Sequence, residues 1–291
     1  MHKIQAKTIL SAHNGMNLYR GCTHGCIYCD SRSTVYGMDH DFEDVAVKET
    51  ALELLEKALA GKRRKCMIGT GSMSDPYMPL EKELEMTRRA LKLIDRYGFG
   101  ATLITKSDLV LRDLDILESI NSKTKAVVQM TITTADEDLC RKLEPGVCTT
   151  ERRFQVLKEL QRMGIPAVVW LAPILPFIND TEKNLQPILE GCRDAGVKGI
   201  ICFGMGLTLR DGNREYFYNQ LDRLFPASDL KERYMKEFGM AYNLTSPDNR
   251  RLMKLFESFC RVNGIMSDSD KIFAYLNEFE QNETVSQLSF L

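Results

Sequence analysis

The chain has 291 residues, of which 44% are hydrophobic and 27% charged, and its formal net charge is −1. This composition is typical of a folded globular protein and excludes a disordered chain. The longest basic run is residues 62–65 (KRRK). The charge therefore gives no support to a general binder of nucleic acid or of membrane surfaces.

No apolar segment marks the chain for secretion or for a membrane. The sequence begins MHKIQ, which lacks the apolar core of a signal peptide. The longest apolar stretches have the length of strands, far below the roughly 20 residues that span a bilayer. We therefore expect a cytoplasmic protein without a membrane contact. There, most of the nine cysteines stay reduced, so a closely spaced group of them indicates a metal site rather than disulfides.

Hydrophobic periodicity predicts short strands that alternate with helices. A brief apolar segment at 17–21 comes first, and apolar residues at helical spacing predict a helix at 42–60. Continuous apolar runs predict strands at 66–71, 101–106, 126–133, 167–172 and 197–203. Helices are expected between these strands at 80–97, 109–120, 150–163 and 182–195.

Six β/α repeats of this kind predict an α/β fold in which a parallel sheet forms a partial (β/α)6 barrel of the TIM type. We assign residues 1–206 to this barrel. After about residue 207 the strand pattern disappears, so 207–291 are expected to form a C-terminal helical extension. Its expected helices are 213–224, 230–238, 247–262 and 271–279. In such barrels the active site lies at the carboxyl ends of the strands.

Three cysteines follow the first apolar segment in the arrangement C-x3-C-x2-C. They are Cys22, Cys26 and Cys29, within GCTHGCIYCD at 21–30. Three thiolates on one loop can ligate three irons of a [4Fe–4S] cubane and leave the fourth iron without a protein ligand. An open iron can chelate the amino and carboxylate groups of S-adenosylmethionine (SAM). One-electron cleavage of SAM then gives methionine and a 5′-deoxyadenosyl radical.

The same cysteines are compatible with two other kinds of site. A zinc site usually needs a second pair of cysteines or histidines, and no such pair follows at the spacing of a finger or ribbon. A closed four-cysteine cluster needs a fourth ligand, which distant Cys66 or Cys140 could supply. His24 is expected beside the cluster or facing solvent rather than as a ligand. Tyr28 is expected to pack against the cluster, and Gly21 to let the backbone wrap closely around it.

The cysteine motif, with an aromatic residue before its third cysteine, resembles that of the radical SAM superfamily. Further segments resemble the branch related to spore photoproduct lyase, whose members include SplB-like proteins labelled DNA repair photolyases. These segments are 69–77 (GTGSMSDPY), 105–107 (TKS), 111–113 (LRD), 143–145 (LEP), 151–154 (ERRF) and 172–176 (APILP). The resemblance spans about residues 15–205. It implies a [4Fe–4S] cluster, SAM and a reductant such as flavodoxin or ferredoxin.

The resemblance also implies a set of SAM contacts, namely Ser74, Asp75, Lys106, Thr131, Arg153 and Ile174. The first two end the second predicted strand and would bind the amino group of the SAM methionine. Lys106 would pair with the SAM carboxylate, or is a surface lysine at a strand end. Thr131 would reach the ribose, or it is merely packed within its strand. Arg153 would reach the SAM carboxylate, or it is an exposed arginine of its helix. Ile174 would border the adenine, or it belongs to the hydrophobic core.

The chain departs from the lyase at two positions. The lyase has a radical-quenching cysteine two residues before the serine of its Ser-Asp pair, where this chain has Ser72. The lyase has a tyrosine directly after its third cluster cysteine, where this chain has Asp30. Because an alcohol O–H bond is much stronger than a thiol S–H bond, Ser72 is a poor hydrogen donor, and the lyase activity is not carried over.

Six cysteines lie outside the motif. Cys140 and Cys148 flank the turn at 144–146 beyond the fourth strand and are candidates for radical-relay thiols. The others are expected to be buried small apolar side chains: Cys66, Cys192, Cys202 and Cys260.

Three functions remain open. The leading one is an enzyme whose adenosyl radical abstracts hydrogen from an unidentified substrate, with the glycine-rich loop 204–213 as part of the pocket or as a simple connector. The second is the same chemistry on a nucleic acid, which rests on analogy and which the charge does not support. The third is a non-catalytic Fe–S electron carrier, which needs no cofactor-sized barrel mouth.

Overall fold

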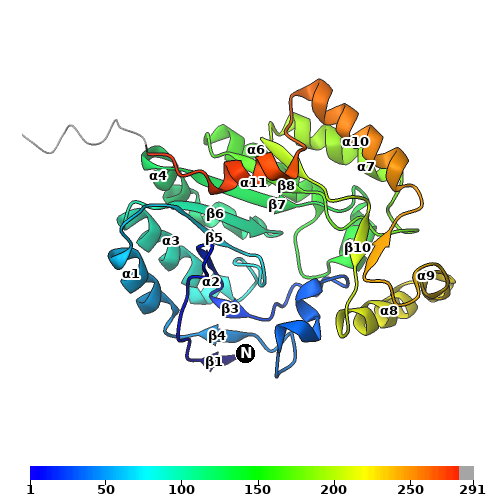
Figure 1. The fold of residues 1–291 in the computed structure, drawn as a ribbon, viewed down its shortest axis with the longest axis horizontal. Helices are drawn as coiled ribbons and strands as arrows, with labels where there is room; N and C mark the ends of the chain where they lie inside the picture. The colour runs from blue at the N-terminus through cyan, green and yellow to red at the C-terminus, as the bar shows by residue number, and fades with distance from the viewer. Residues whose placement is uncertain (282–291) are drawn as a thin grey trace, which may run out of the picture.

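The computed structural model describes residues 1–281, and a sheet of six parallel strands lies at its centre (Figure 1). In spatial order the strands are β2 (Gly15–Met16), β5 (Met67–Thr70), β6 (Gly100–Thr105), β7 (Ala126–Thr131), β8 (Ala167–Trp170) and β9 (Gly199–Ile201). Each strand pairs in parallel with the next one in this order. Helices connect the strands, as in an open barrel. The expected partial barrel of the TIM type is confirmed.

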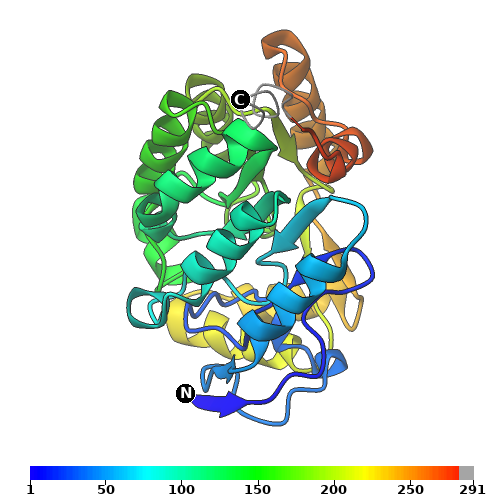
Figure 2. The ribbon, with the colours of Figure 1, turned by 90° about the vertical axis from the view of Figure 1, so that its left-hand side faces the viewer.

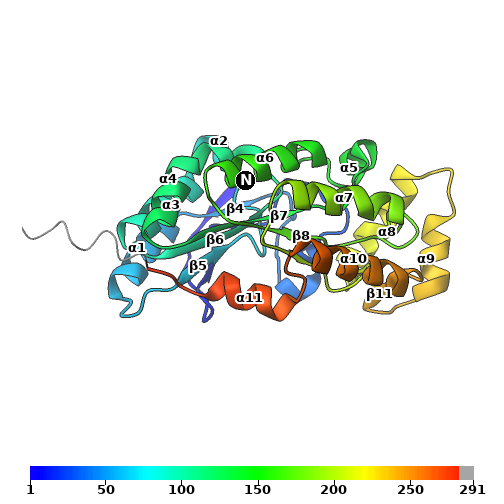
Figure 3. The same ribbon diagram turned by 90° about the horizontal axis from the view of Figure 1, so that it is seen from above.

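Helices cover both faces of this sheet (Figure 3). Those between the strands lie on one side: α3 (Met86–Arg96), α4 (Leu114–Lys123), α6 (Thr150–Arg162) and α7 (Glu182–Asp194). Helix α1 (Ala51–Gly61) packs beside α3. The C-terminal helix α11 (Ser269–Asn277) lies on the opposite side, where Ile272 and Leu276 share a core cluster with Val127 and Val168. Strand β7 is buried along its whole length because it is covered from both sides.

The predicted helix at 42–60 is wrong in its first part. Residues Ala46–Lys48 form a strand, β4, and α1 begins only at Ala51. Strand β4 pairs in parallel with β1 (His2–Ile4) and antiparallel with β3 (Tyr19–Arg20). The β-branched Val47 fits this short strand, whose pairing partners lie more than 25 positions away in the sequence.

Two other predicted helices are divided. The one at 80–97 becomes α2 (Glu81–Leu84) and α3, separated by Glu85 in the left-handed conformation at φ 48°. The buried Glu81 carboxylate accepts a hydrogen bond from the amide of Thr87, at the start of α3. The one at 109–120 becomes a 3-10 turn, η3 (Asp108–Asp113), followed by α4. A short helix that the sequence did not predict, α5 (Glu137–Leu143), precedes α6.

The C-terminal segment contains helices close to the expected ones and one unexpected ribbon. Helices α8 (Asn213–Leu224) and α9 (Leu230–Phe238) have the predicted bounds, and α10 (Asn249–Asn263) packs on α7. Strands β10 (Gly206–Thr208) and β11 (Asn243–Thr245) form an antiparallel pair. At three residues each, they are too short to show a strand pattern.

The C-terminal segment packs on the cysteine loop. Phe217 of α8 and Tyr234 of α9 share a core cluster with Cys26 and Tyr28. Figures 1 and 2 both show α8 close to the N-terminal segment that follows the cysteines. A domain boundary at residue 206 stays a prediction. Across residues 1–281, no helix is both long and apolar enough to cross a membrane.

Candidate functional site

The three motif cysteines lie on a loop between β3 and a 3-10 turn, η1 (Asp30–Arg32), and two backbone contacts hold this loop. The amide of Cys22 donates to the carbonyl of Phe42 at 3.0 Å, and the amide of Ile27 donates to the carbonyl of Leu143 at 3.0 Å. Gly21 has φ 88°, and a Cβ there would stand 2.4 Å from the Phe42 carbonyl oxygen. Glycine is therefore required where the loop begins.

The three thiols are close enough to influence one another, but they are not tightly clustered. Burial raises the pKa of Cys26, and the neighbouring Cys29 and Cys22 raise it further. Among the described residues, these sulfurs do not form a set that all lie within 4.8 Å of one another. A tetrahedral zinc ion, with Zn–S bonds of about 2.3 Å, holds its sulfurs about 3.8 Å apart. In this arrangement the three sulfurs therefore do not have the spacing of a single zinc site.

A cavity of about 640 Å³ opens beside the third cysteine, at the carboxyl ends of the strands. One wall comes from the cysteine loop and the ends of β5 to β8: Tyr28, Cys29, Asp30, Ser31, Gly71, Ser72, Ile104, Lys106, Thr131, Trp170, Ala172 and Pro173. The other wall comes from the segment after β9, the β10–β11 ribbon and the start of α10: Phe203 to Thr208, Asn243 to Thr245, and Asn249. The cavity therefore lies at the strand ends, where the barrel fold predicts an active site.

Lys106 brings a positive charge to this cavity. Its Nζ atom lies 5.9 Å from the centre of the Tyr28 ring. Burial acts to lower the pKa of Lys106, but the nearby Cys26 and Glu144 raise it above its usual value. Within residues 1–281 the ammonium makes no hydrogen bond or ion pair. An anionic group in the cavity would therefore meet a cation that has no other direct partner.

Asp75 and Ser74 lie behind the cavity wall rather than on it. The Asp75 carboxylate accepts hydrogen bonds from the Thr105 hydroxyl at 2.7 Å, the Lys106 amide at 2.8 Å and the Tyr77 amide at 2.9 Å. The Ser74 hydroxyl donates to the carbonyl of Tyr19 at 3.4 Å. These side chains are engaged within the protein, and Asp75 fixes the backbone from which Lys106 projects.

Arg153 is buried in a network of hydrogen bonds and an ion pair below the cavity. The alternative that it is an exposed arginine of its helix is therefore wrong. Its side chain and that of Glu144 are both fully buried and form an ion pair. The guanidinium also donates to the carbonyls of Cys148 and Thr131, both at 3.0 Å. The hydroxyl of Tyr28 donates to the same Glu144 carboxylate. The network thus ties α6 to β7 and to the cysteine loop.

The remaining expected residues divide between cavity and core. Thr131 lines the cavity, whereas Ile174 is 1% exposed in the main core and only its neighbours Ala172 and Pro173 reach the cavity. Neither candidate relay thiol lines it. Cys140 is buried against Arg153 and Glu144. Cys192, Cys202 and Cys260 are buried as expected, and Cys66 is half-buried.

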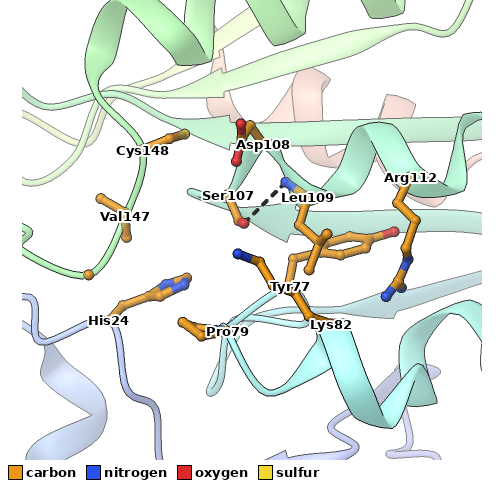
Figure 4. Close-up of a pocket in the computed structure, with 11 residues that line it drawn as sticks. His24, Tyr77, Pro79, Lys82, Ser107, Asp108, Leu109, Arg112, Val147 and Cys148 are labelled. Atoms are coloured by element: carbon orange, nitrogen blue, oxygen red, sulfur yellow. Dashed lines mark hydrogen bonds between the residues drawn. The ribbon is translucent and has the colours of Figure 1, made fainter.

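His24 is buried at 3% exposure, so the alternative that it faces solvent is wrong. Its Nδ1 atom lies 3.4 Å from the Asp75 carboxylate. Burial acts to lower the pKa of His24, but Asp75 and Cys22 raise it to about 10. His24 borders a second, smaller cavity of about 350 Å³, and Figure 4 shows it there with Cys148 nearby and Arg112 at the far side. Cys148 donates to the Lys106 carbonyl at 3.2 Å.

The sequence did not single out the aromatic wall of the larger cavity. Trp170 donates from Nε1 to Gln129 at 2.7 Å, and Gln129 donates to Thr102 at 2.8 Å, so a polar ladder across three strands fixes the indole. Phe203 is 65% exposed and stacks on Phe273 of α11. Polar residues at alternating positions within apolar strands are the signal that could have revealed this inward face.

Comparisons with known proteins agree with this arrangement. A model of the radical SAM superfamily matches residues 16–186. An uncharacterised protein of Mycobacterium tuberculosis is 27% identical over 240 residues, which cover 80% of this chain and 69% of the relative. An uncharacterised protein of Methanocaldococcus jannaschii is 35% identical over 170 residues, which cover 57% of this chain and 62% of the relative.

Solved structures share the fold at low sequence identity. A mutant of spore photoproduct lyase superposes with a TM-score of 0.62 at 14% identity, over 89% of this chain and 78% of the lyase chain. The radical SAM methyltransferase TsrM of Kitasatospora setae, solved with cobalamin and a [4Fe–4S] cluster, superposes with a TM-score of 0.50 at 14% identity. That match covers 67% of this chain and 37% of TsrM.

Proposed function

The chain belongs to the radical SAM superfamily and is an enzyme, and from this premise we propose that Cys22, Cys26 and Cys29 hold a [4Fe–4S] cluster beside a SAM-binding cavity. Bound there, the cluster and SAM would supply a 5′-deoxyadenosyl radical that abstracts hydrogen from a substrate. The observation that carries the proposal is that the third motif cysteine and Lys106 line one cavity at the strand ends. The C-x3-C-x2-C arrangement of the three cysteines also fits three irons of a cubane.

The residues in and behind this cavity would have different roles in binding SAM. Lys106 would bind the SAM carboxylate, and Thr131 and Pro173 would border the ribose and adenine. Asp75 would act indirectly by holding the Lys106 backbone. The buried Arg153 and the core residue Ile174 would support the cavity from behind rather than contact SAM.

The wall outside the family-matched residues 16–186 is proposed to contact the substrate. It includes the segment 203–208 and the ribbon strand β11. The loop that begins at Gly204 would belong to this wall, since its first residues line the cavity. A one-electron reductant such as flavodoxin or ferredoxin would deliver the electron, and the compartment would be the cytoplasm, where the cysteines stay reduced.

A second candidate is the same chemistry on a nucleobase. The exposed ring of Phe203 and the indole of Trp170 lie 6.0 Å apart, centre to centre, at the larger cavity. Aromatic side chains at such a site can stack on a base. Spore photoproduct lyase has been solved with a dinucleoside photoproduct. The net charge of −1 gives no support to a long nucleic acid as the substrate.

The proposed function is tested by SAM cleavage. Anaerobically reconstituted protein, given dithionite and SAM, is expected to form 5′-deoxyadenosine, and omission of the reductant should stop it. The Cys29→Ala variant should be inactive, whereas Cys66→Ala, which changes a cysteine outside the site, should match the wild type. A cluster-loaded wild type that forms no 5′-deoxyadenosine would favour the electron carrier instead.

Replacing Lys106 with alanine is expected to weaken SAM binding while the cluster remains. The lost charge-assisted contact is worth about 1.5–3 kcal/mol, or roughly ten- to a hundredfold in affinity. Equilibrium binding of SAM to cluster-loaded protein measures this effect. Lys82→Ala is the matched control, because Lys82 is an exposed lysine of the smaller cavity. Equal SAM affinity in the two variants would remove Lys106 from the site.

A further inference from the structure

Two histidines and an aspartate meet where β1 pairs with β4 (Figure 1). They are His2 on β1, and His40 and Asp44 in the segment that precedes β4. One nitrogen or carboxylate oxygen of each lies within 4.8 Å of those of the other two. Within residues 1–281 this is the only such group of histidine, cysteine and acidic side chains. The two imidazole rings are 4.6 Å apart, centre to centre, and nearly perpendicular.

The ring of His40 is fixed in the way that proteins fix a metal ligand. Its Nδ1 atom donates to the carbonyl of Asp41 at 3.0 Å. Because a carbonyl can only accept, Nδ1 carries the proton, and Nε2 of the neutral ring carries a lone pair. This Nε2 atom is buried, and it has no hydrogen-bond partner within the described residues, which is unfavourable. Metal-binding histidines commonly donate one nitrogen to a backbone carbonyl and ligate with the other.

His2 and Asp44 have the spacing of two ligands on one metal ion. The Nδ1 atom of His2 lies 2.9 Å from Oδ2 of Asp44, and two donor atoms on a tetrahedral zinc ion lie about 3.3 Å apart. The other oxygen of Asp44 lies 2.6 Å from the amino group of Met1. This amino group and His2 hold the pKa of Asp44 below its usual value, so the carboxylate is ionised and attracts cations.

We propose that His2, His40 and Asp44 bind a zinc ion, with water as the fourth ligand. Imidazole nitrogen and carboxylate oxygen are ordinary zinc ligands. The ion replaces the Met1 ammonium as the partner of the carboxylate, and neutral His2 carries its proton on Nε2 instead of Nδ1. The side chains of His2 and Asp44 are 38% and 43% exposed, so solvent can supply the fourth ligand. None of the three residues lines the larger or the smaller cavity, so the ion is structural rather than catalytic.

The ion fixes the segment that holds the start of the cysteine loop. Phe42 lies between two of the zinc ligands in the sequence, and its carbonyl accepts the hydrogen bond from the amide of Cys22 at 3.0 Å. The amide of His2 donates to the carbonyl of Val45 at 3.1 Å, so β1 already contacts this segment. A metal ion shared between the two restricts Phe42 further, and with it the backbone of Cys22.

Zinc binding to cluster-loaded protein without an affinity tag tests the site. Anaerobic titration with Zn²⁺, in competition with a chromophoric chelator, gives the stoichiometry and the affinity. We expect one tight site per chain, and at least tenfold weaker binding in His40→Ala and in His2→Gln, because even residues that only support a ligand contribute ten- to a hundredfold. His13→Ala is the matched control, since His13 is exposed and lies outside the group, and it should match the wild type.

Hydrogen exchange followed by mass spectrometry tests the effect on the cysteine loop. Zinc should slow the exchange of peptides that contain Cys22 or residues 40–45 in the wild type and in His13→Ala, but not in His40→Ala. Zinc should also raise the melting temperature of the first two proteins alone, because a ligand that binds only the folded state stabilises it. Tight zinc binding that leaves the Cys22 peptide unchanged would overturn this effect.

Two results would overturn the site itself: equal zinc affinity in the His40, His2 and His13 variants, or tighter binding of Fe²⁺ than of Zn²⁺. Fe²⁺ is compared because two histidines and a carboxylate also bind iron in some enzymes. Neither result bears on the proposed function, which SAM cleavage tests. If the wild type held no cluster, the zinc test would still stand, because the same differences are expected when Cys22, Cys26 and Cys29 are all replaced with alanine.

Discussion

Replacing Arg153 with leucine is expected to lower the free energy of unfolding by about 3–5 kcal/mol. Arg153 and Glu144 form an ion pair in which both side chains are fully buried. Leucine would leave the Glu144 carboxylate without its main partner, and burial of an unpaired charge is strongly destabilising. The carbonyls of Thr131 and Cys148 would also lose their donors.

Thermal unfolding measures this effect, and the single tryptophan of the chain, Trp170, reports on it by fluorescence. The expected drop in melting temperature is about 6–20 °C. Arg162→Leu is the control, because its ion pair with Glu159 is exposed and should contribute little. Adding Glu144→Leu to Arg153→Leu should recover part of the loss, since no charge is then left unpaired. Similar melting of the Arg153 and Arg162 variants would contradict the network's importance.

Replacing Cys22, Cys26 and Cys29 together with alanine is expected to abolish iron binding. The wild type should carry about four iron and four sulfide per chain after anaerobic reconstitution, and the triple variant almost none. The reason is that cluster assembly depends on thiolate ligands, and the other cysteines near the site are engaged elsewhere. Cys140 contacts Arg153 and Glu144, and Cys148 donates to a backbone carbonyl.

Iron and sulfide analysis with the visible absorption spectrum provides the measurement. Cys66→Ala is the matched control, because Cys66 lies at the opposite end of β5 from the cavity and its loss should leave the iron content unchanged. A triple variant that keeps its iron would show that the cluster, if present, is bound elsewhere.

The parts of the site that the sequence predicts are those set by local pattern. The cysteine motif is contained in eight consecutive residues, and Lys106 follows directly on an apolar strand. The alternation of strands and helices is likewise a local signal, and it leads to the partial barrel. Such features depend on the residues themselves and on the common rule that barrel sites lie at strand ends.

The parts that could not be predicted depend on pairs far apart in the sequence. Tyr28 and Glu144 are separated by 116 positions, yet the hydrogen bond from the Tyr28 hydroxyl holds the Glu144 carboxylate beneath the cysteine loop. The Asp75 side chain points to the end of β6 because the Thr105 hydroxyl and the Lys106 amide donate hydrogen bonds to its carboxylate. Sequence pattern locates a residue at a strand end but does not state which neighbour its side chain will meet.

The most direct test of the account is the electron paramagnetic resonance (EPR) spectrum of the reduced cluster with and without SAM. If three cysteines leave one iron open, SAM binds at that iron, and the spectrum of the wild type should change when SAM is added. Lys106→Ala should need more SAM for the same change. A reduced [4Fe–4S] signal that saturating SAM leaves unaltered would mean a cluster closed by a fourth protein ligand, and it would contradict the proposal that this cavity binds SAM.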